Sequence, residues 1–161
     1  MRRSKGNKRA LVRVRRGNRH DSAKFLRLVA LFAKAIHLKP PDTAANRRLI
    51  HDIFSTKRVH LLVATAGTTL VGYALYFYAY SSFAGRSCLF VEDLFVLSEY
   101  RDLGVGRLLL MKCAKDALRH DCDSMKWEVL LWNKGAMAFF RRLGAQRLGL
   151  YSYQLFLDKL K

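Results

Sequence analysis

The chain has 161 residues, of which 51% are hydrophobic, and a formal net charge of +18 at pH 7. This length and apolar content predict a folded domain with a core of its own and exclude a disordered chain. No apolar run reaches the roughly 20 residues of a membrane helix, and the basic N-terminus lacks the apolar region of a secretory signal. We therefore expect a cytoplasmic protein with no membrane partner.

Positive charge is concentrated near the N-terminus, where nine Lys or Arg residues precede the first acid, Asp21. Residues 1–10 are predicted to form a flexible basic arm, and residues 11–161 a single domain. The positive charge of this arm predicts weak association with nucleic acid or capture of anionic ligands. The alternative is a solvated tail. The three cysteines show no metal-type spacing, which predicts reduced thiols and no metal site.

The first quarter of the chain predicts one strand and two helices. Leu11–Arg15 alternates apolar and basic residues, as a half-buried strand does. Asp21–Ser22 is a candidate N-cap for a helix whose apolar residues recur at helical spacing, and Pro40–Pro41 would end it. Asp42–Thr43 is a candidate cap for a second, shorter helix.

The middle of the chain predicts a sheet. Val59–Ala64 and Thr69–Tyr80 flank a turn at Ala66–Gly67 and form a hairpin. The second strand is rich in aromatic residues, which we assign mainly to core packing. Ser87–Leu97 is predicted as a third long strand.

The last third of the chain predicts helices and strands in alternation. A helix to about Leu118 is followed by a strand over Met125–Leu131 and a short helix around Ala136–Phe140. Gly144 is placed to stop that helix. Gln146–Leu157 is predicted to supply one or two final strands.

The most informative stretch runs from Glu92 to Arg107. A strand there passes through a polar turn and meets Gly104 and Gly106, where a helix begins. An uncapped helix start offers unpaired N–H groups and about half a positive charge, and glycine lets the backbone approach phosphates closely. The pattern predicts a diphosphate site, and an ordinary tight turn before a packed helix is the alternative.

Three separated blocks together resemble a known family. Arg101-x-x-Gly104-x-Gly106 resembles the acetyl-CoA loop of the GNAT N-acetyltransferases. The Glu92–Asp93 pair before it and Trp132–Asn133 after it are similar to the diamine (spermidine/spermine) and thialysine acetyltransferase branch. The resemblance implies an α/β (α+β) GNAT fold, with a mixed, mostly antiparallel sheet of six to seven strands and about four flanking helices. It also implies a homodimer.

The resemblance further implies acetyl-CoA as co-substrate, with its pyrophosphate at the backbone amides after Arg101 and its pantetheine arm along the preceding strand. The residues expected to contact it are Leu94, Phe95, Val96, Arg101, Asp102, Leu103, Gly104, Val105, Gly106, Arg107, Asn133, Gly135, Ala136 and Phe140.

Acetyl transfer to an amine requires removal of a proton, because a free alkylamine has a pKa near ~10.4. Glu92 is the expected general base, acting through water, and Asp93 alternates to the other face of the strand. Two structural acids held in salt bridges are the alternative. The residues expected to line the acceptor site are Glu92, Asp93, His37, Glu128 and Trp132, the last of which is equally compatible with a core position.

Two positions depart from the branch. Phe140 occupies the place where the family usually has a tyrosine that protonates the leaving thiolate, and phenylalanine has no proton to give. Polyamine-acetylating relatives carry acidic residues between the first two helices. The corresponding stretch here, residues 35–41, contains none.

The sequence therefore predicts an acetyl-CoA-dependent N-acetyltransferase. Its acceptor would be the primary amine of a diamine, polyamine or lysine-like small molecule, which attacks directly in a ternary complex. A protein lysine or N-terminal acetyltransferase acting on nucleic-acid-associated proteins is the second hypothesis. A non-catalytic module that binds CoA or nucleic acid is the third.

Overall fold

The computed structural model describes residues 12–157. The chain divides after Glu128 into two compact units. The elements of the first unit are β1 (Val12–Arg16), the 3-10 turn η1 (Arg19–Asp21), α2 (Ser22–Ala35), α3 (Thr43–Phe54), β2 (His60–Ala66), β3 (Thr69–Ser81), β4 (Arg86–Val96), η2 (Ser98–Tyr100), α4 (Val105–Arg119) and β5 (Met125–Trp127). The second unit contains α5 (Lys134–Arg142). The predicted arm at residues 1–10 lies outside the described residues, and the single domain over 11–161 stays a prediction.

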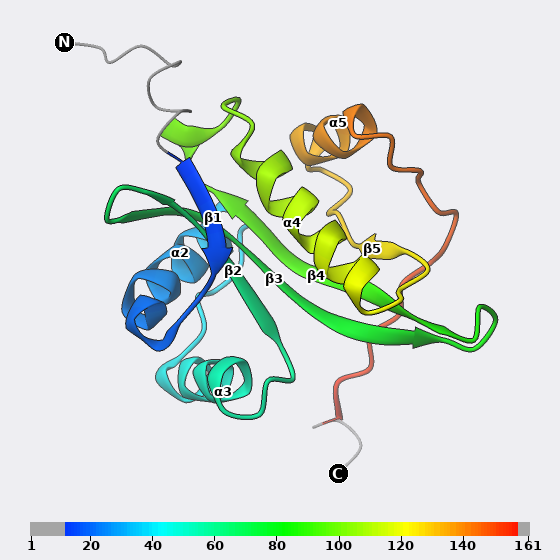
Figure 1. Cartoon of the computed structure of the whole chain (residues 1–161), viewed down its shortest axis with the longest axis horizontal. Helices are drawn as coiled ribbons and strands as arrows, with labels where there is room; N and C mark the ends of the chain where they lie inside the picture. Colours follow the sequence, from blue (N-terminus) through cyan, green and yellow to red (C-terminus); the bar gives the residue numbers. More distant parts are fainter. Residues whose placement is uncertain (1–11, 158–161) are drawn as a thin grey trace. The chain divides into compact units, whose positions relative to one another are not determined.

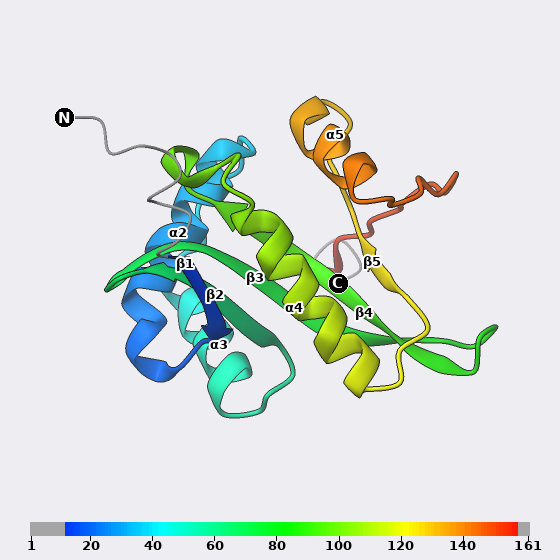
Figure 2. The same ribbon diagram turned by 45° about the horizontal axis from the view of Figure 1, so that its top comes forward.

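The first unit is a mixed, mostly antiparallel sheet with helices on both faces. The strands lie in the order β1-β2-β3-β4-β5, and only β4 and β5 pair in parallel. Figures 1 and 2 show α2 and α3 on one side of this sheet and α4 on the other. This arrangement confirms the predicted mixed α/β architecture. No helix in the described part of the chain is long and apolar enough to cross a membrane.

The strand count was predicted wrongly, because residues 12–157 contain five strands and not six to seven. The strand expected over Met125–Leu131 ends at Trp127, where its pairing with Val91 of β4 ends. The residues from Gln146 to Leu157 form no strand and are all exposed. A strand needs a partner for its backbone groups, and neither segment finds one among the described residues.

The α2 side of the sheet holds the main apolar core. The helical stripe of α2 packs there with Ile53 of α3 and with residues of β2, β3 and β4. Phe25 is fully buried, and its ring meets the ring of Tyr73 edge to face, with centroids 5.0 Å apart. Burial of this stripe fixes α2 on the sheet, as its spacing predicts.

Both ends of α2 differ in detail from the prediction. Asp21 precedes the helix without capping it, because its carboxylate accepts from the Arg15 guanidinium at 2.6 and 2.8 Å and from the Asn18 N–H at 2.9 Å. The helix ends at Ala35, ahead of the prolines. His37 adopts a φ of 61°, and Leu38 N–H donates to the Ala33 carbonyl at 2.8 Å, which closes the last turn.

A buried carboxylate ties α4 to the other face of the sheet. Asp116 is 0% exposed and accepts from the Tyr76 hydroxyl at 2.7 Å. Its carboxylate also forms ion pairs with two guanidinium groups. That of Arg119, on the same helix, lies 3.2 Å away, and that of Arg16, in β1, lies 3.4 Å away. Burial raises the pKa of Tyr76, and the neighbouring Asp116 raises it further. Asp116 therefore links α4, β3 and β1 through one carboxyl group.

Candidate active site

β4 carries a bulge at the expected catalytic position. The register pairs Leu75 of β3 with Asp93 and Tyr76 with Val91, so Glu92 is an extra residue in β4. A bulge leaves one residue without a partner and redirects the side chains around it, and bulges are frequent beside active sites. The Glu92 side chain is exposed.

One edge of β4 is open beyond this bulge. β5 pairs with β4 only along Leu89–Val91. Among residues 12–157, no strand continues on that side of β4 from Glu92 to Val96. Apart from the Val96 carbonyl, which accepts from Arg101 Nε at 3.0 Å, the main-chain groups on this edge are therefore available to an extended ligand, which adds to a sheet edge as a further strand would.

The chain enters α4 through a loop that leaves the helix start uncapped. Gly104 has a φ of 81°, a left-handed conformation that favours glycine, and no side chain caps the helix. Leu108 N–H donates to the Gly104 carbonyl at 3.0 Å and makes the first bond of the helix. The N–H groups of Val105, Gly106 and Arg107 therefore precede the intrahelical ladder. Such a start attracts an anion, and a diphosphate fits it.

Arg101 braces this loop against the end of β4. Its Nε donates to the Val96 carbonyl at 3.0 Å. The main chain of Leu97 is also fixed, because its N–H donates to the Val71 carbonyl at 2.9 Å. Asp102 has a φ of 60°, which is uncommon for a residue other than glycine but tolerated by aspartate. The loop thus leads directly from the open edge of β4 to the start of α4.

Asp93 lies on the α2 side of the sheet. Its carboxylate accepts from the Tyr73 hydroxyl at 3.0 Å. Burial raises the pKa of Asp93 to about 6; the bond from Tyr73 opposes this shift, and the negative charge of Glu92 adds to it. Burial also raises the pKa of Tyr73, with Asp93 contributing. The two adjacent acids thus occupy different environments, one exposed and one largely buried.

We expect Asp93→Asn to stabilise the protein above pH 6. Folded Asp93 has a pKa of about 6 against 3.8 for the ordinary group, so its ionisation opposes folding. This contribution to the free energy of unfolding falls as pH rises from about 4 to about 6 and stays low above that range. Asparagine still accepts from Tyr73 but carries no charge, so the variant should gain about 2–3 kcal/mol at neutral pH and little at pH near 4.

Urea unfolding of both proteins across this pH range measures the difference. Asp123→Asn, at an exposed acid outside the pair, is the matched control. Parallel pH curves for all three proteins would show that burial of Asp93 has no energetic consequence.

The second unit carries the remaining expected cofactor residues. The Asn133 side chain accepts from Ala136 N–H at 3.0 Å and caps α5, which contains Gly135 and Ala136 in its first turn. Phe140 is half-buried, and its ring lies 5.1 Å from that of Phe139. Trp132 is 50% exposed, so it is not a core residue of this unit. Gly144, with a φ of 84°, follows the end of α5 as predicted.

Two further expected residues lie at the ends of elements of the first unit. His37 is exposed in the link from α2 to α3, and Glu128 is exposed just after β5. The first unit thus brings together Glu92, Asp93 and the strand and loop predicted for the cofactor. Among residues 12–157, no three His, Cys, Asp or Glu side chains gather into a possible metal site.

Sequence reasoning missed the partners of the buried acids. Tyr73 was grouped with the other aromatic residues of its strand as packing, although its hydroxyl serves Asp93. Asp116 was not singled out at all. A signal for it exists, because it falls three residues after buried Cys113 on the apolar stripe of α4, where a charge is unusual.

Comparison with known proteins places this geometry in a family. The family model for the acetyltransferase (GNAT) family matches residues 26–145. The thialysine N-epsilon-acetyltransferase of Bos taurus is 35% identical over 148 residues, covering 86% of each chain. An L-ornithine N5-acetyltransferase of Arabidopsis thaliana is 36% identical over 77 residues, which are 48% of this chain and 34% of that protein.

The fold has close structural neighbours as well. An integron cassette protein from the mobile metagenome of V. cholerae superimposes with a TM-score of 0.76 at 22% identity, covering 93% of this chain and 97% of the other. At 22% identity this structural similarity supports the fold and nothing beyond it. The family model and the bovine relative carry the assignment further: this chain is an N-acetyltransferase of the GNAT family.

Proposed function

We propose that this protein transfers an acetyl group from acetyl-CoA to the primary amine of a small molecule, in a ternary complex. The observation that carries the proposal is the continuity of three features in the first unit. The bulged, exposed Glu92, the open edge of β4 and the uncapped start of α4 follow one another along a single stretch of chain.

The residues present suit acetyl-CoA, which supplies an activated acetyl group when bound. The N–H groups of Val105, Gly106 and Arg107 would hold the pyrophosphate, and Arg107 adds an exposed positive charge in the same turn. The main chain of β4 from Leu94 to Val96 would pair with the pantetheine arm. From the family resemblance, Asn133 and the first turn of α5 would add further contacts.

Glu92 would prepare the amine for attack. A primary amine arrives protonated at neutral pH, since its pKa is near ~10.4. An exposed carboxylate attracts the ammonium group and accepts its proton through a water molecule. The buried charge of Asp93, beside Glu92 in the strand, strengthens the attraction for a cation.

A lysine-like amino acid is the acceptor that we favour. The relatives reported above are named for thialysine and L-ornithine, which are both amino acids with an amine in the side chain. The link between α2 and α3, residues 36–42, has no acid before Asp42 to pair with a longer polycation. The net charge of +18 also repels a polyamine more than a molecule that carries its own carboxylate.

A thiol-release assay tests the proposal. The protein is mixed with acetyl-CoA and, in turn, lysine, thialysine, ornithine, spermidine and a lysine-containing peptide. Turnover should be fastest with the amino acids. Turnover only with the peptide would favour a protein acetyltransferase, and binding of acetyl-CoA without thiol release would leave a non-catalytic module.

We also propose a homodimer in the cytoplasm. Residues from Leu148 to Leu157 expose several large apolar side chains, among them Leu150 at 79% and Tyr153 at 91%. A second copy would remove this surface from water. Three free cysteines, two of them buried, are compatible with a reducing compartment. Light scattering measures the mass in solution.

Phe140→Tyr is expected to raise kcat several-fold. In the branch that this chain resembles, a tyrosine at this position protonates the departing thiolate, and a positioned acid contributes to such a step. The gain should be largest at pH values below the ordinary tyrosine pKa of ~10, where the phenol still carries the proton that it donates. Phe139→Tyr, at the adjacent half-buried position of α5, is the matched control. A flat or lower kcat for Phe140→Tyr, or an equal gain in both variants, would argue against this role.

A further inference from the structure

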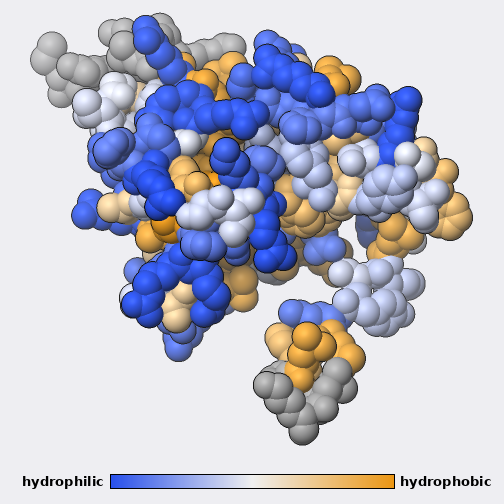
Figure 3. Space-filling model, turned by 60° about the horizontal axis from the view of Figure 1, so that its bottom comes forward, coloured by the Kyte–Doolittle hydropathy of each residue, from blue (hydrophilic) through white to orange (hydrophobic). Residues whose placement is uncertain are grey.

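The strand β1 and the helix α4 border an apolar groove on one face of the sheet. This β1–α4 groove has a volume of about 250 Å³ and is lined by Val12, Val14, Leu108, Met111, Lys112 and Lys115. Leu108 and Met111 are 43% and 49% exposed. Hydrophilic side chains cover most of the surface visible in Figure 3, so a group of exposed apolar side chains differs from the general character of the surface. Apolar surface bordered by charged side chains is typical of an interaction site.

β1 also has a free main-chain edge. It is an outer strand of the sheet, and no strand among residues 12–157 pairs with its second side. In an antiparallel pair, residues that bond to the partner strand alternate with residues whose N–H and C=O point away from it. Gly17 N–H donates to the Leu61 carbonyl of β2 at 2.9 Å, so the alternation from this point turns the main-chain groups of Val12 and Val14 outwards.

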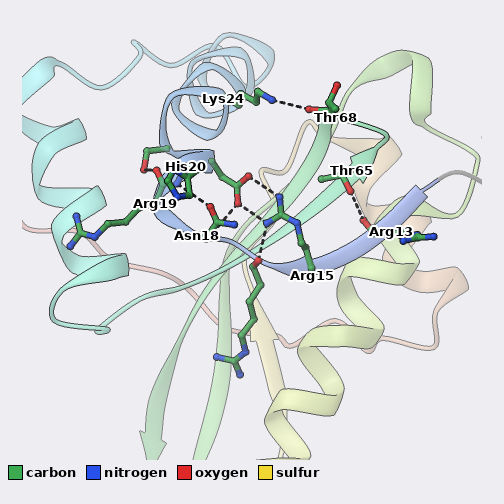
Figure 4. Close-up of polar contacts among 11 residues, drawn as sticks. Arg13, Arg15, Asn18, Arg19, His20, Lys24, Thr65 and Thr68 are labelled. Carbon is green, nitrogen blue, oxygen red and sulfur yellow. Dashed lines mark hydrogen bonds and ion pairs between the residues drawn. The ribbon is translucent and has the colours of Figure 1, made fainter.

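Two nearby contacts agree with this alternation. Figure 4 shows the Thr65 side chain of β2 at the Arg13 carbonyl, 3.5 Å from it, on the bonded side of β1. The Arg16 carbonyl, on the outer side, accepts from Arg15 Nη1 at 3.0 Å. The outward N–H and C=O groups of the two valines therefore remain for a strand that adds to this edge.

Cations lie on both faces of the place that an added strand would take. Side chains alternate along β1, so Arg13 lies on the α2 side of the sheet, opposite to the groove. Lys112 and Lys115 border the groove on the α4 side. None of these three side chains forms an ion pair within residues 12–157. Asp116, the one acid in the sequences of β1 and α4, is buried.

Charge distinguishes between the chains that could occupy this edge. Residues 1–10 contain five Lys or Arg residues and no acid, and a second copy of the chain carries a net charge of +18. Either of these would bring positive charge to cations that have no ion-pair partner, whereas an acidic segment is attracted to them.

We propose that the free edge of β1 binds an extended segment of another protein that has the pattern apolar–acidic–apolar, flanked by further acids. Residues directly opposite each other share a face of the sheet, so the two apolar side chains enter the β1–α4 groove opposite Val12 and Val14. The acid between them lies opposite Arg13, and flanking acids reach Lys112 and Lys115. This inference goes beyond acetyl transfer and does not depend on it.

Amide hydrogen exchange of the full chain, followed by NMR, tests the proposal. The probe is the end-blocked heptapeptide Glu-Glu-Val-Glu-Val-Glu-Glu, whose symmetric sequence suits either strand direction. At saturation it should slow exchange at the outward amides of Val12 and Val14 at least about ten-fold. The amides of Arg13 and Arg15, which already face β2, should not change. Matched peptides with lysine in place of glutamate, or serine in place of valine, should give no such protection.

Variants of the lysines test the charge. Lys112→Gln/Lys115→Gln should weaken binding of the heptapeptide about three- to ten-fold, the combined effect of two exposed charge contacts. Lys34→Gln/Lys39→Gln removes the same charge from α2 and the residues after it, and should bind as the native protein does. Thermal melting checks that each variant folds.

Equal losses in the two lysine variants, or equal binding of the three peptides, would overturn the proposal. Slow exchange at Val14 in the free chain that disappears when residues 1–10 are removed would make the chain's own N-terminus the occupant. Protection that rises with protein concentration alone would make a second copy the occupant. Either result would also overturn the proposal.

Discussion

Replacing Glu92 by glutamine is expected to lower kcat for amine acetylation by about 100- to 1,000-fold. A positioned general base contributes about 10²- to 10⁴-fold to such reactions, and glutamine cannot accept the amine proton. The exposed side chain sits at a bulge in β4 and holds no ion pair with another described residue. The fold and the affinity for acetyl-CoA should therefore change little.

Steady-state kinetics across pH distinguish loss of a base from loss of charge. Without a base, Glu92→Gln should recover rate only as the pH approaches the amine pKa of ~10.4, where the amine arrives already deprotonated. Glu99→Gln removes the same charge from η2, close to the loop but outside the expected site, and should keep the native rate at neutral pH. If Glu92→Gln retained a rate within about three-fold of the native protein, the base would have to be another group.

Elements that bury an apolar face of their own were predictable from sequence. The stripe of α2 meets the sheet at Phe25, and the hairpin of β2 and β3 turns at Gly67, which has a φ of 60°. In both cases the local pattern and the tertiary packing agree, and local periodicity is then sufficient. The glycine loop before α4 was visible for a similar reason, because Gly104 is needed for its left-handed backbone.

Features that depend on a distant partner were not predictable in the same way. Nothing in the local sequence says that Glu92 is the unpaired residue of a bulge, since that follows from the register with β3. The apolar alternation from Gln146 onwards is typical of a strand, but pairing needs a second strand that the described chain does not supply there. Asp21 has the right position for a helix cap, yet Arg15 competes for its carboxylate.

The Asp93 environment shows the same limit within the candidate site. Alternation along β4 predicts that the two acids point in different directions. It does not predict that Asp93 accepts a hydrogen bond from the Tyr73 hydroxyl. The raised pKa of Asp93 follows from burial beneath α2, which only the assembled sheet provides. Sequence therefore identified the acids, and tertiary structure gives them different properties.

Asp116→Ala is expected to lower the free energy of unfolding by about 1–3 kcal/mol, which is the usual cost of leaving a buried hydrogen-bonding group without its partner. The change removes the acceptor of the Tyr76 hydroxyl, which donates to Asp116 at 2.7 Å. Tyr76 is 1% exposed, so water does not readily replace that acceptor. It also leaves the exposed guanidinium groups of Arg16 and Arg119 without the anion that they share. Such a loss is a measurable fraction of the roughly 5–15 kcal/mol that stabilises a typical domain.

Urea denaturation of a small series separates the charge from the hydrogen bond. Asp116→Asn keeps an acceptor for Tyr76 and should lose less than Asp116→Ala. The double variant Asp116→Ala/Tyr76→Phe removes the stranded hydroxyl, so its loss should be smaller than the sum of the two single losses. Additive losses, or a cost for Asp116→Ala below about 1 kcal/mol, would mean that water replaces the carboxylate and that α4 is held to the sheet by its apolar stripe alone.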